Sequence, residues 1–222
     1  MKFFLLIIFT LLFSNYMQAQ HGYLGVKAGL GLNNITYKNT LKTTNYNPTF
    51  NAAITFEKLF KNKYFLGVDF MYQTLGFIEP FSIINNFGKT TGETGEIIYN
   101  FRYINLPLSA GIYQGTKWKK IISIAIIPGI LMNAKTTVPA YKSNGKQKVA
   151  QSFDVSNQPN QFDFSGQINF GIGRNINTKT FIYSLAGFQR SFTTLSNDDY
   201  FLDADLKHFS FSIAIGFKYV CY

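Results

Sequence analysis

The chain is poor in cysteine, in charge and in long apolar runs. Cys221 is the one cysteine among 222 residues, so no internal disulfide is possible and no cysteine-based metal site is indicated. Charged residues make up 14% of the chain, whereas soluble domains average roughly 25%. Beyond the N-terminus, the longest apolar run extends from Ile121 to Met132. That run is too short for a membrane-spanning helix, which needs about 20 apolar residues.

The N-terminus has the three-part layout of an export signal. Lys2 is followed by an apolar run from Phe3 to Phe13 and by a polar stretch that ends at Ala19. This pattern predicts a secretory signal peptide over residues 1–19, with cleavage between Ala19 and Gln20. Residues 20–222 then form one mature domain.

What the mature chain has in abundance is aromatic residues in alternating patterns. Aromatic residues are 18% of the chain, yet mean hydropathy is only +0.02. Apolar residues recur at every second position, as in "HFSFSIAIGFKY" from His208 to Tyr219, and this period is typical of β-strands. The segments that show it are "GYLGVKAGLGLNNIT", "FNAAITFEK", "YFLGVDFMYQ", "EIIYNFRYINLPLSAGIY", "KIISIAIIPGILMNAK", "FDFSGQINFGIG", "TFIYSLAGFQRSF" and the closing segment.

Short and long connections alternate between these segments. The short ones are "LFKNK", "QGTKWK" and "RNINTK". The long ones are Tyr37 to Pro48, Ile78 to Thr94, Thr136 to Asn160 and Thr193 to Leu206. This layout predicts an all-β fold: an eight-stranded antiparallel up-and-down transmembrane barrel with short periplasmic turns and four longer extracellular loops.

Volume predicts which face of each strand points outward. An eight-stranded barrel is only just wide enough inside for side chains to fill it. We therefore expect the bulky rows to face lipid, including Ile97, Tyr99, Phe101 and Tyr103 of the fourth segment. The charged residues expected inside, as opposite-charge pairs, are Lys27, Glu57, Asp69, Arg102, Asp163, Arg190 and Lys218.

Two prolines conflict with a continuous closed sheet. Pro107 and Pro128 fall inside the fourth and fifth segments, and a closed barrel offers no edge strand for a proline. We expect a bulge at each proline, or a strand end close to it.

The formal net charge of +10 suggests which partners the chain has. The lysines lie in turns and form no dense stripe with interleaved aromatic residues, so nucleic-acid binding is not indicated. A scattered basic surface fits outer-membrane lipids and the phosphates of lipopolysaccharide. A protein partner in the periplasm or outside the cell is also compatible with this layout.

The segment "YINLPLSAGIY", Tyr103 to Tyr113, resembles the PorT-like outer-membrane β-barrel family of Gram-negative bacteria. The stretches "GVKAGLGLNNI", "PGILMNAK", "FDFSGQINFGIG" and "FSFSIAIGFKY" agree with that resemblance. It implies an eight-stranded, porin-like barrel, mostly of unassigned substrate, with a subset that acts in protein secretion and gliding. It also implies that the C-terminal aromatic Tyr222 is read by the barrel-assembly machinery. Family members often have glutamate where this chain has Asn105, so a role of that carboxylate does not transfer.

Candidates for chemistry are few, and we expect no enzyme activity, no cofactor and no metal. His208 and Ser210 resemble the base and nucleophile of outer-membrane lipid A deacylases, which makes a lipid A-modifying hydrolase one alternative function. Asp198, Asp199, Asp203 and Asp205 offer oxygen ligands for a cation, without the spacing of an EF-hand. A soluble periplasmic barrel that carries a lipid is the other alternative.

Overall fold

The computed structural model describes residues 21–38, 44–61, 63–84, 88–141, 147–197 and 205–221. The expected signal peptide and its cleavage site between Ala19 and Gln20 lie outside these residues and stay a prediction. Among the described residues, no helix is long and apolar enough to cross a membrane.

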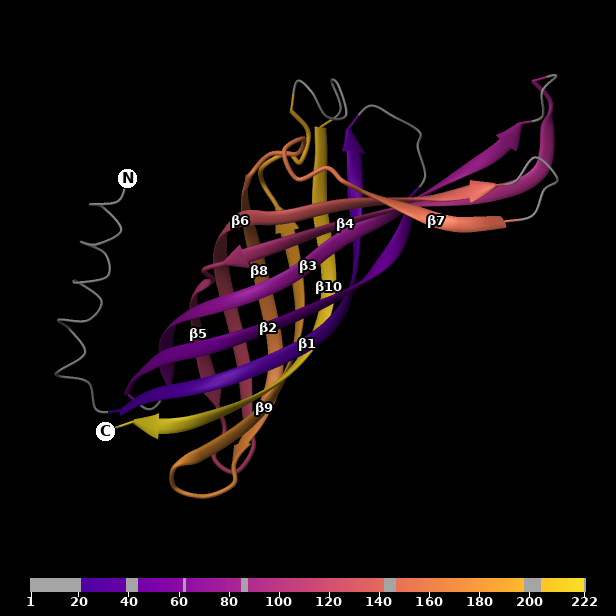
Figure 1. The fold of residues 1–222 in the computed structure, drawn as a ribbon. Coiled ribbons are helices and arrows are strands. Elements are labelled where there is room, and N and C mark those ends of the chain that lie inside the picture. Colours follow the sequence, from indigo (N-terminus) through magenta and orange to yellow (C-terminus); the bar gives the residue numbers. More distant parts are fainter. Residues whose placement is uncertain are drawn as a thin grey trace.

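The described chain is a sheet of antiparallel strands (Figure 1). These are β1 (His21–Lys38), β2 (Asn45–Phe60), β3 (Tyr64–Ile84), β4 (Thr90–Asn105), β5 (Leu108–Gln114), β6 (Lys119–Tyr141), β7 (Gln147–Asp154), β8 (Phe162–Asn175), β9 (Thr180–Ser191) and β10 (Asp205–Cys221). The sheet closes on itself because β1 pairs with β10 at one side and with β2 at the other, while β2 also pairs with β3.

The ring of eight positions agrees with the prediction, but the described residues form ten strands in all, so the count of eight strands needs correction. Eight positions in the ring correspond to the eight predicted segments, but β4 and β5 share one of them. Both pair with β3 on one side and with β6 on the other. The remaining strand, β7, pairs with the end of β6 that extends beyond the ring and is not itself part of the ring.

The long connections are also more regular than predicted. Much of the expected loop from Ile78 to Thr94 is β-strand, since β3 runs on to Ile84 and β4 begins at Thr90. The expected loop from Thr136 to Asn160 contains the hairpin of β6 and β7. In Figure 1 these two hairpins project together beyond the ring, away from the end where β10 finishes. Two of the four connections that the sequence assigned to loops therefore form an extended, strand-built surface.

The prolines show how the ring tolerates a broken strand. Pro107 lies in the interruption between β4 and β5, which confirms the strand break expected there. Pro128 instead continues β6, opposite Phe164, and the nearby bulge falls at Met132. The carbonyl of Pro128 accepts a hydrogen bond from the N–H of Leu106 at 2.9 Å, so its missing N–H faces the break in the neighbouring strand. A bulge at Pro128 itself was the wrong expectation.

The outward face is apolar around much of the ring, as predicted for β1, β2, β3 and β10. The most exposed positions on these strands include Leu30 at 70%, Ile213 at 66% and Phe70 at 56%. The fourth segment has the opposite phase from the one predicted. Phe101 and Tyr103 are buried inside the ring, and Arg102 is exposed. Arg190 on β9 is exposed as well, so neither arginine lies in the lumen.

Glycines on the neighbouring, paired strands make room for the aromatic rings that turn inward. A side-chain carbon at Gly216 would lie 2.2 Å from the ring of Tyr183, and one at Gly111 would lie 2.5 Å from the ring of Phe65. Because a glycine lacks that carbon, each ring occupies the space where its neighbour's side chain would be. The lumen therefore accommodates bulky side chains, although the volume argument from the sequence assumed that it is too narrow for them.

Candidate functional site: the barrel lumen and its mouth

A charged layer, defined as Lys27, Glu57, Asp69, Tyr113, Tyr183 and Lys218, crosses the lumen toward the end with short turns. Lys218 forms an ion pair with Glu57, and both side chains are nearly fully buried. The hydroxyl of Tyr113 donates to Glu57 Oε1 at 2.6 Å and accepts from Lys218 Nζ at 3.0 Å. The ammonium of Lys218 also lies 4.4 Å from the centre of the Tyr183 ring. The pair is thus compensated by hydrogen bonds and a ring face, which buried charges require.

The second ion pair of the charged layer borders the small cavities of the barrel. Lys27 Nζ lies 2.5 Å from Asp69 Oδ2. Lys27 lines two cavities of about 30 Å³ and 20 Å³, and Asp69 lines the larger of them. Each has room for about one or two water molecules. Asp69 Oδ1 and Thr55 Oγ1, which have no protein hydrogen-bond partner, provide polar contacts for such waters.

A chain of neutral side chains crosses the lumen above the charges. Asn105 Nδ2 donates to Gln73 Oε1 at 2.7 Å, and Gln73 Nε2 donates to Gln189 Oε1 at 2.9 Å. Gln189 Nε2 donates in turn to Ser165 Oγ at 2.8 Å. The chain joins β4, β3, β9 and β8 through buried groups. Asn105 is therefore a member of an uncharged network.

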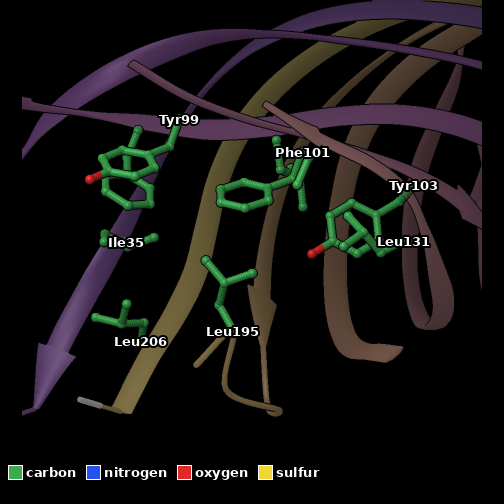
Figure 2. Close-up of a cluster of buried hydrophobic side chains, with 10 residues drawn as sticks. Ile35, Tyr99, Phe101, Tyr103, Leu131, Leu195 and Leu206 are labelled. Carbon is green, nitrogen blue, oxygen red and sulfur yellow. The ribbon is translucent and has the colours of Figure 1, made fainter. Parts of the chain in front are cut away.

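The mouth of the barrel, beneath the long hairpins, is filled by apolar side chains. This mouth cluster consists of Ile35, Leu75, Phe77, Tyr99, Phe101, Tyr103, Leu131, Ala134, Leu195 and Leu206. Figure 2 shows side chains from β1, β4, β6 and β10 pointing toward one another inside the ring. Phe77 and Phe101 are fully buried, and their rings stack with centroids 6.3 Å apart.

Two connections close over the mouth cluster. The amide of Asn160 donates to the carbonyls of Thr194 and Ser196, and its backbone N–H donates to the carbonyl of Leu195. Leu195 N–H donates to the carbonyl of Leu206 on β10 at 2.7 Å. The segments around Asn160 and Leu195 are therefore bound to each other and to the barrel wall. Together with the mouth cluster they cover this end of the lumen.

The structure places both candidate catalytic residues inside the barrel. His208 and Ser210 share the inward face of β10, and each is 3% exposed. His208 Nδ1 lies 3.1 Å from Asn33 Oδ1, which also accepts from the backbone N–H of Gly76. The ring of Phe101 packs against the His208 ring at 5.4 Å. The pair thus faces the underside of the mouth cluster and not the lipid-facing wall.

The acidic candidates for a metal site are only partly described. Asp198, Asp199 and Asp203 lie outside the described residues. Asp205 forms a half-exposed ion pair with Lys207 at 3.2 Å. Within the described ranges, no group of three or more His, Cys, Asp or Glu side chains is placed to hold a metal ion.

Several contacts in the lumen were not foreseen from the sequence. Tyr113 and Tyr183 complete the charged layer, and Gln73 and Gln189 form the neutral chain. The amides were visible as polar positions within alternating segments, but nothing local indicated their partners. Tyr183 lies in a segment whose alternation is weak, so its inward direction had no sequence signal.

Similar folds occur among solved outer-membrane proteins. Ail, the attachment invasion locus protein of Yersinia pestis, is 14% identical over 91% of this chain and all of that chain, with a TM-score of 0.39. OprG from Pseudomonas aeruginosa is 10% identical over 91% of this chain and 96% of its own, with a TM-score of 0.46. The protease OmpT from Escherichia coli is 9% identical over 92% and 98%, with a TM-score of 0.45.

The family assignment comes from the sequence itself. No curated protein matches the chain. Residues 18–193, however, match the family described as outer membrane protein beta-barrel domain. That match covers most of the chain and agrees with the closed ring and the apolar outer wall. The chain therefore belongs to the outer membrane protein beta-barrel domain family and is an outer-membrane β-barrel protein.

Proposed function

We propose that this protein is a non-enzymatic, non-conducting outer-membrane barrel that acts through its surface, as a structural, interaction or secretion-associated component. The observation that carries the proposal is the filled lumen. The charged layer, the neutral amide chain and the mouth cluster follow one another along the barrel interior. Two small cavities among the described residues each have room for about one or two waters. On this filling we expect neither a permeation path nor room for a lipid ligand.

Sidedness follows from the connections. We place the short turns and the chain termini in the periplasm, as is usual for bacterial barrels. The paired hairpins β3–β4 and β6–β7 then face the cell exterior. They present the long strand-built surface on which a protein partner would dock.

We also propose that the chain belongs to the PorT-like group within its family. The motif "YINLPL" coincides with the break between β4 and β5, where Pro107 interrupts the strand. The carbonyl of Pro107 accepts the N–H of Asp69, which holds the broken strand in the ring. A secretion role would appear as secretion-machinery proteins recovered with the tagged barrel from solubilised outer membranes.

Planar-bilayer recording tests the filled lumen. The purified, refolded chain is expected to produce no conductance steps, while its shifted migration on unheated gels confirms that it is folded. Arg102→Ala, a change on the outside of the ring, serves as the matched variant and is expected to remain silent. Steady steps from the folded wild-type protein would contradict the proposal.

Lipid A mass spectra test the absence of hydrolase activity. Both His208 and Ser210 lie inside the ring beneath the mouth cluster, out of reach of an acyl chain in the membrane. A deletion strain is therefore expected to show the same lipid A acylation as its parent. The deletion strain could instead show a lipid A species with an added acyl chain. If that species disappears when the wild-type gene is restored, but persists with the Ser210→Ala gene, the proposed absence of hydrolase activity is wrong.

A further inference from the structure

Positive charges gather at the rim formed by the short turns. This basic collar consists of Lys58, Lys61, Lys63, Lys117, Lys120, Arg174 and Lys179. All are exposed or half-buried in the structure. The sequence contains no Asp or Glu in residues 58–68, 97–153, 164–197 or 206–222, which include the strand ends at this rim. Glu57, the nearest carboxylate, is buried and paired with Lys218.

The opposite end of the barrel carries charges of both signs. Glu79, Glu96, Asp154 and Asp205 lie there among Lys89, Arg102, Lys135, Arg190 and Lys207. Asp205 and Lys207 form an ion pair at 3.2 Å. Among the described residues, positive charge is therefore concentrated at the short-turn rim, and only that rim presents a field of one sign.

The collar begins where the apolar outer wall ends. Phe60, Tyr64 and Trp118 are 39–50% exposed at this level. The ammonium of Lys58 lies 5.3 Å from the centre of the Phe60 ring, and that of Lys63 lies 5.4 Å from the Tyr64 ring.

Arg174 belongs to the same arrangement. Its guanidinium lies 5.3 Å from the Trp118 ring and links two adjacent turns. In each case the charged group lies over the face of an exposed aromatic ring at the edge of the apolar wall. Such an arrangement places cations at the level of lipid head groups.

We propose that the basic collar binds the phosphodiesters of anionic phospholipids in the adjacent, periplasmic leaflet and so collects these lipids around the barrel. The proposal rests on the proposed membrane insertion and sidedness. A phospholipid is favoured over an acidic protein because the cations surround the ring at the edge of the apolar wall, where head groups are already in contact. Clustered Lys and Arg next to a membrane surface attract anionic lipid in this way.

Trp118, the one tryptophan of the chain, is a built-in reporter within the collar. The full chain is inserted into vesicles of equimolar phosphatidylcholine and phosphatidylglycerol. In each of two samples, a small fraction of one lipid carries a nitroxide near the head of an acyl chain, which quenches Trp118 on contact. Labelled phosphatidylglycerol is expected to quench at least about twofold more than labelled phosphatidylcholine. The preference should shrink in 1 M salt, where screening extends over only about 3 Å.

Two matched variants assign the preference to the collar. K61Q/K63Q/K117Q/K120Q removes collar charges and keeps Arg174 beside Trp118, and the quenching ratio is expected to fall toward one. K89Q/R102Q/K135Q/K207Q removes the same number of cations from the other end and should keep the wild-type ratio. A ratio of one in the wild type, or an equal fall in both variants, would overturn the proposal.

The same experiment separates this inference from the proposed insertion. If the chain does not insert, neither labelled lipid quenches Trp118 as a membrane-embedded residue, and the gel shift of the folded barrel is missing. If the chain inserts and both labelled lipids quench equally, the proposed membrane insertion is supported, and the proposal that the collar selects anionic lipid is wrong.

Discussion

The charged layer and the mouth cluster fill the same lumen by opposite means. In the charged layer, Lys218 and Glu57 are buried together, and Tyr113 satisfies both. In the mouth cluster, Phe77 and Phe101 are buried with no ionic group between their rings. The stability of the charged layer depends on every partner being present, because one unpaired charge buried in the lumen is very costly. The mouth cluster depends on volume and tolerates small losses at one position by relaxation of its neighbours.

The first way to break this comparison is to remove one charge from the charged layer. Lys218→Met leaves the buried Glu57 without its cation, and we expect a loss of about 3–5 kcal/mol in the free energy of unfolding. Denaturant unfolding of the refolded barrel in lipid vesicles measures it. Lys207→Met is the control, because its half-exposed pair with Asp205 contributes at most about 1 kcal/mol.

The double variant Lys218→Met/Glu57→Gln sharpens the same result. It removes both charges of the pair and is expected to recover much of the loss. A single variant as stable as the wild type would show that the pair is not buried as described.

A cavity in the mouth cluster is the matching change at the other end. Phe101→Ala removes a fully buried ring, and we expect a cost of about 3–5 kcal/mol in unfolding free energy, reduced to the extent that neighbours collapse. Exposed Arg102 next to it is the control, since Arg102→Ala should change stability by about 0.5 kcal/mol or less. Equal effects at both positions would contradict the inward phase of β4.

The close contact between Gly216 and the Tyr183 ring tests the packing of the charged layer on a finer scale. Gly216→Ala places a methyl group against the Tyr183 ring of the charged layer, and we expect a loss of about 1–3 kcal/mol in unfolding free energy. The double variant Gly216→Ala/Tyr183→Leu shortens the opposing side chain and should recover part of it. Without any such recovery, the cost would lie in the backbone of β10 and not in the ring.

The smallest expected effect concerns the cover of the mouth. Bonds from the Ser156 hydroxyl at 2.5 Å and its N–H at 2.9 Å lower the pKa of the exposed Asp154 carboxyl below its usual value. A carboxylate with a lowered pKa stabilises the folded turn above its unfolded pKa of about 3.9, and the effect is lost as pH falls through the folded pKa. The protection of residues 154–161 against hydrogen exchange, measured relative to the intrinsic exchange rate at each pH, should therefore fall in acid. Asp154→Asn should exchange faster at neutral pH and show a smaller acid response.

The sequence predicted correctly which side chains point outward in those strands whose outer face is apolar along much of their length. In β10, Phe211 and Ile213 alternate with Ser212 and Ala214, and the predicted phase agrees with the structure. In β4 the rule failed because the wall near the mouth carries polar groups outside, such as Arg102, and apolar groups inside. Apolar and polar residues still alternate in β4, but there the apolar residues point inward and the polar residues point outward.

The contents of the lumen were predictable only in part. The opposite-charge pairing of Lys27, Asp69, Glu57 and Lys218 follows from the cost of isolated buried charges, and it is confirmed. The room that Gly216 leaves for Tyr183 depends on two strands being side by side. That contact is set by register, which one strand's alternation does not contain.

Site-directed spin labels along β10 test the central claim, that this strand divides lipid from a filled lumen. Cysteine variants of Cys221→Ser protein at Phe211, Ile213 and Ile215 are labelled in vesicles, alongside variants at Ser212 and Ala214. The outward set is expected to collide readily with oxygen and poorly with a water-soluble nickel complex, while the inward set should be poorly accessible to both. High nickel accessibility along the inward set, or no alternation between the two sets, would contradict the account.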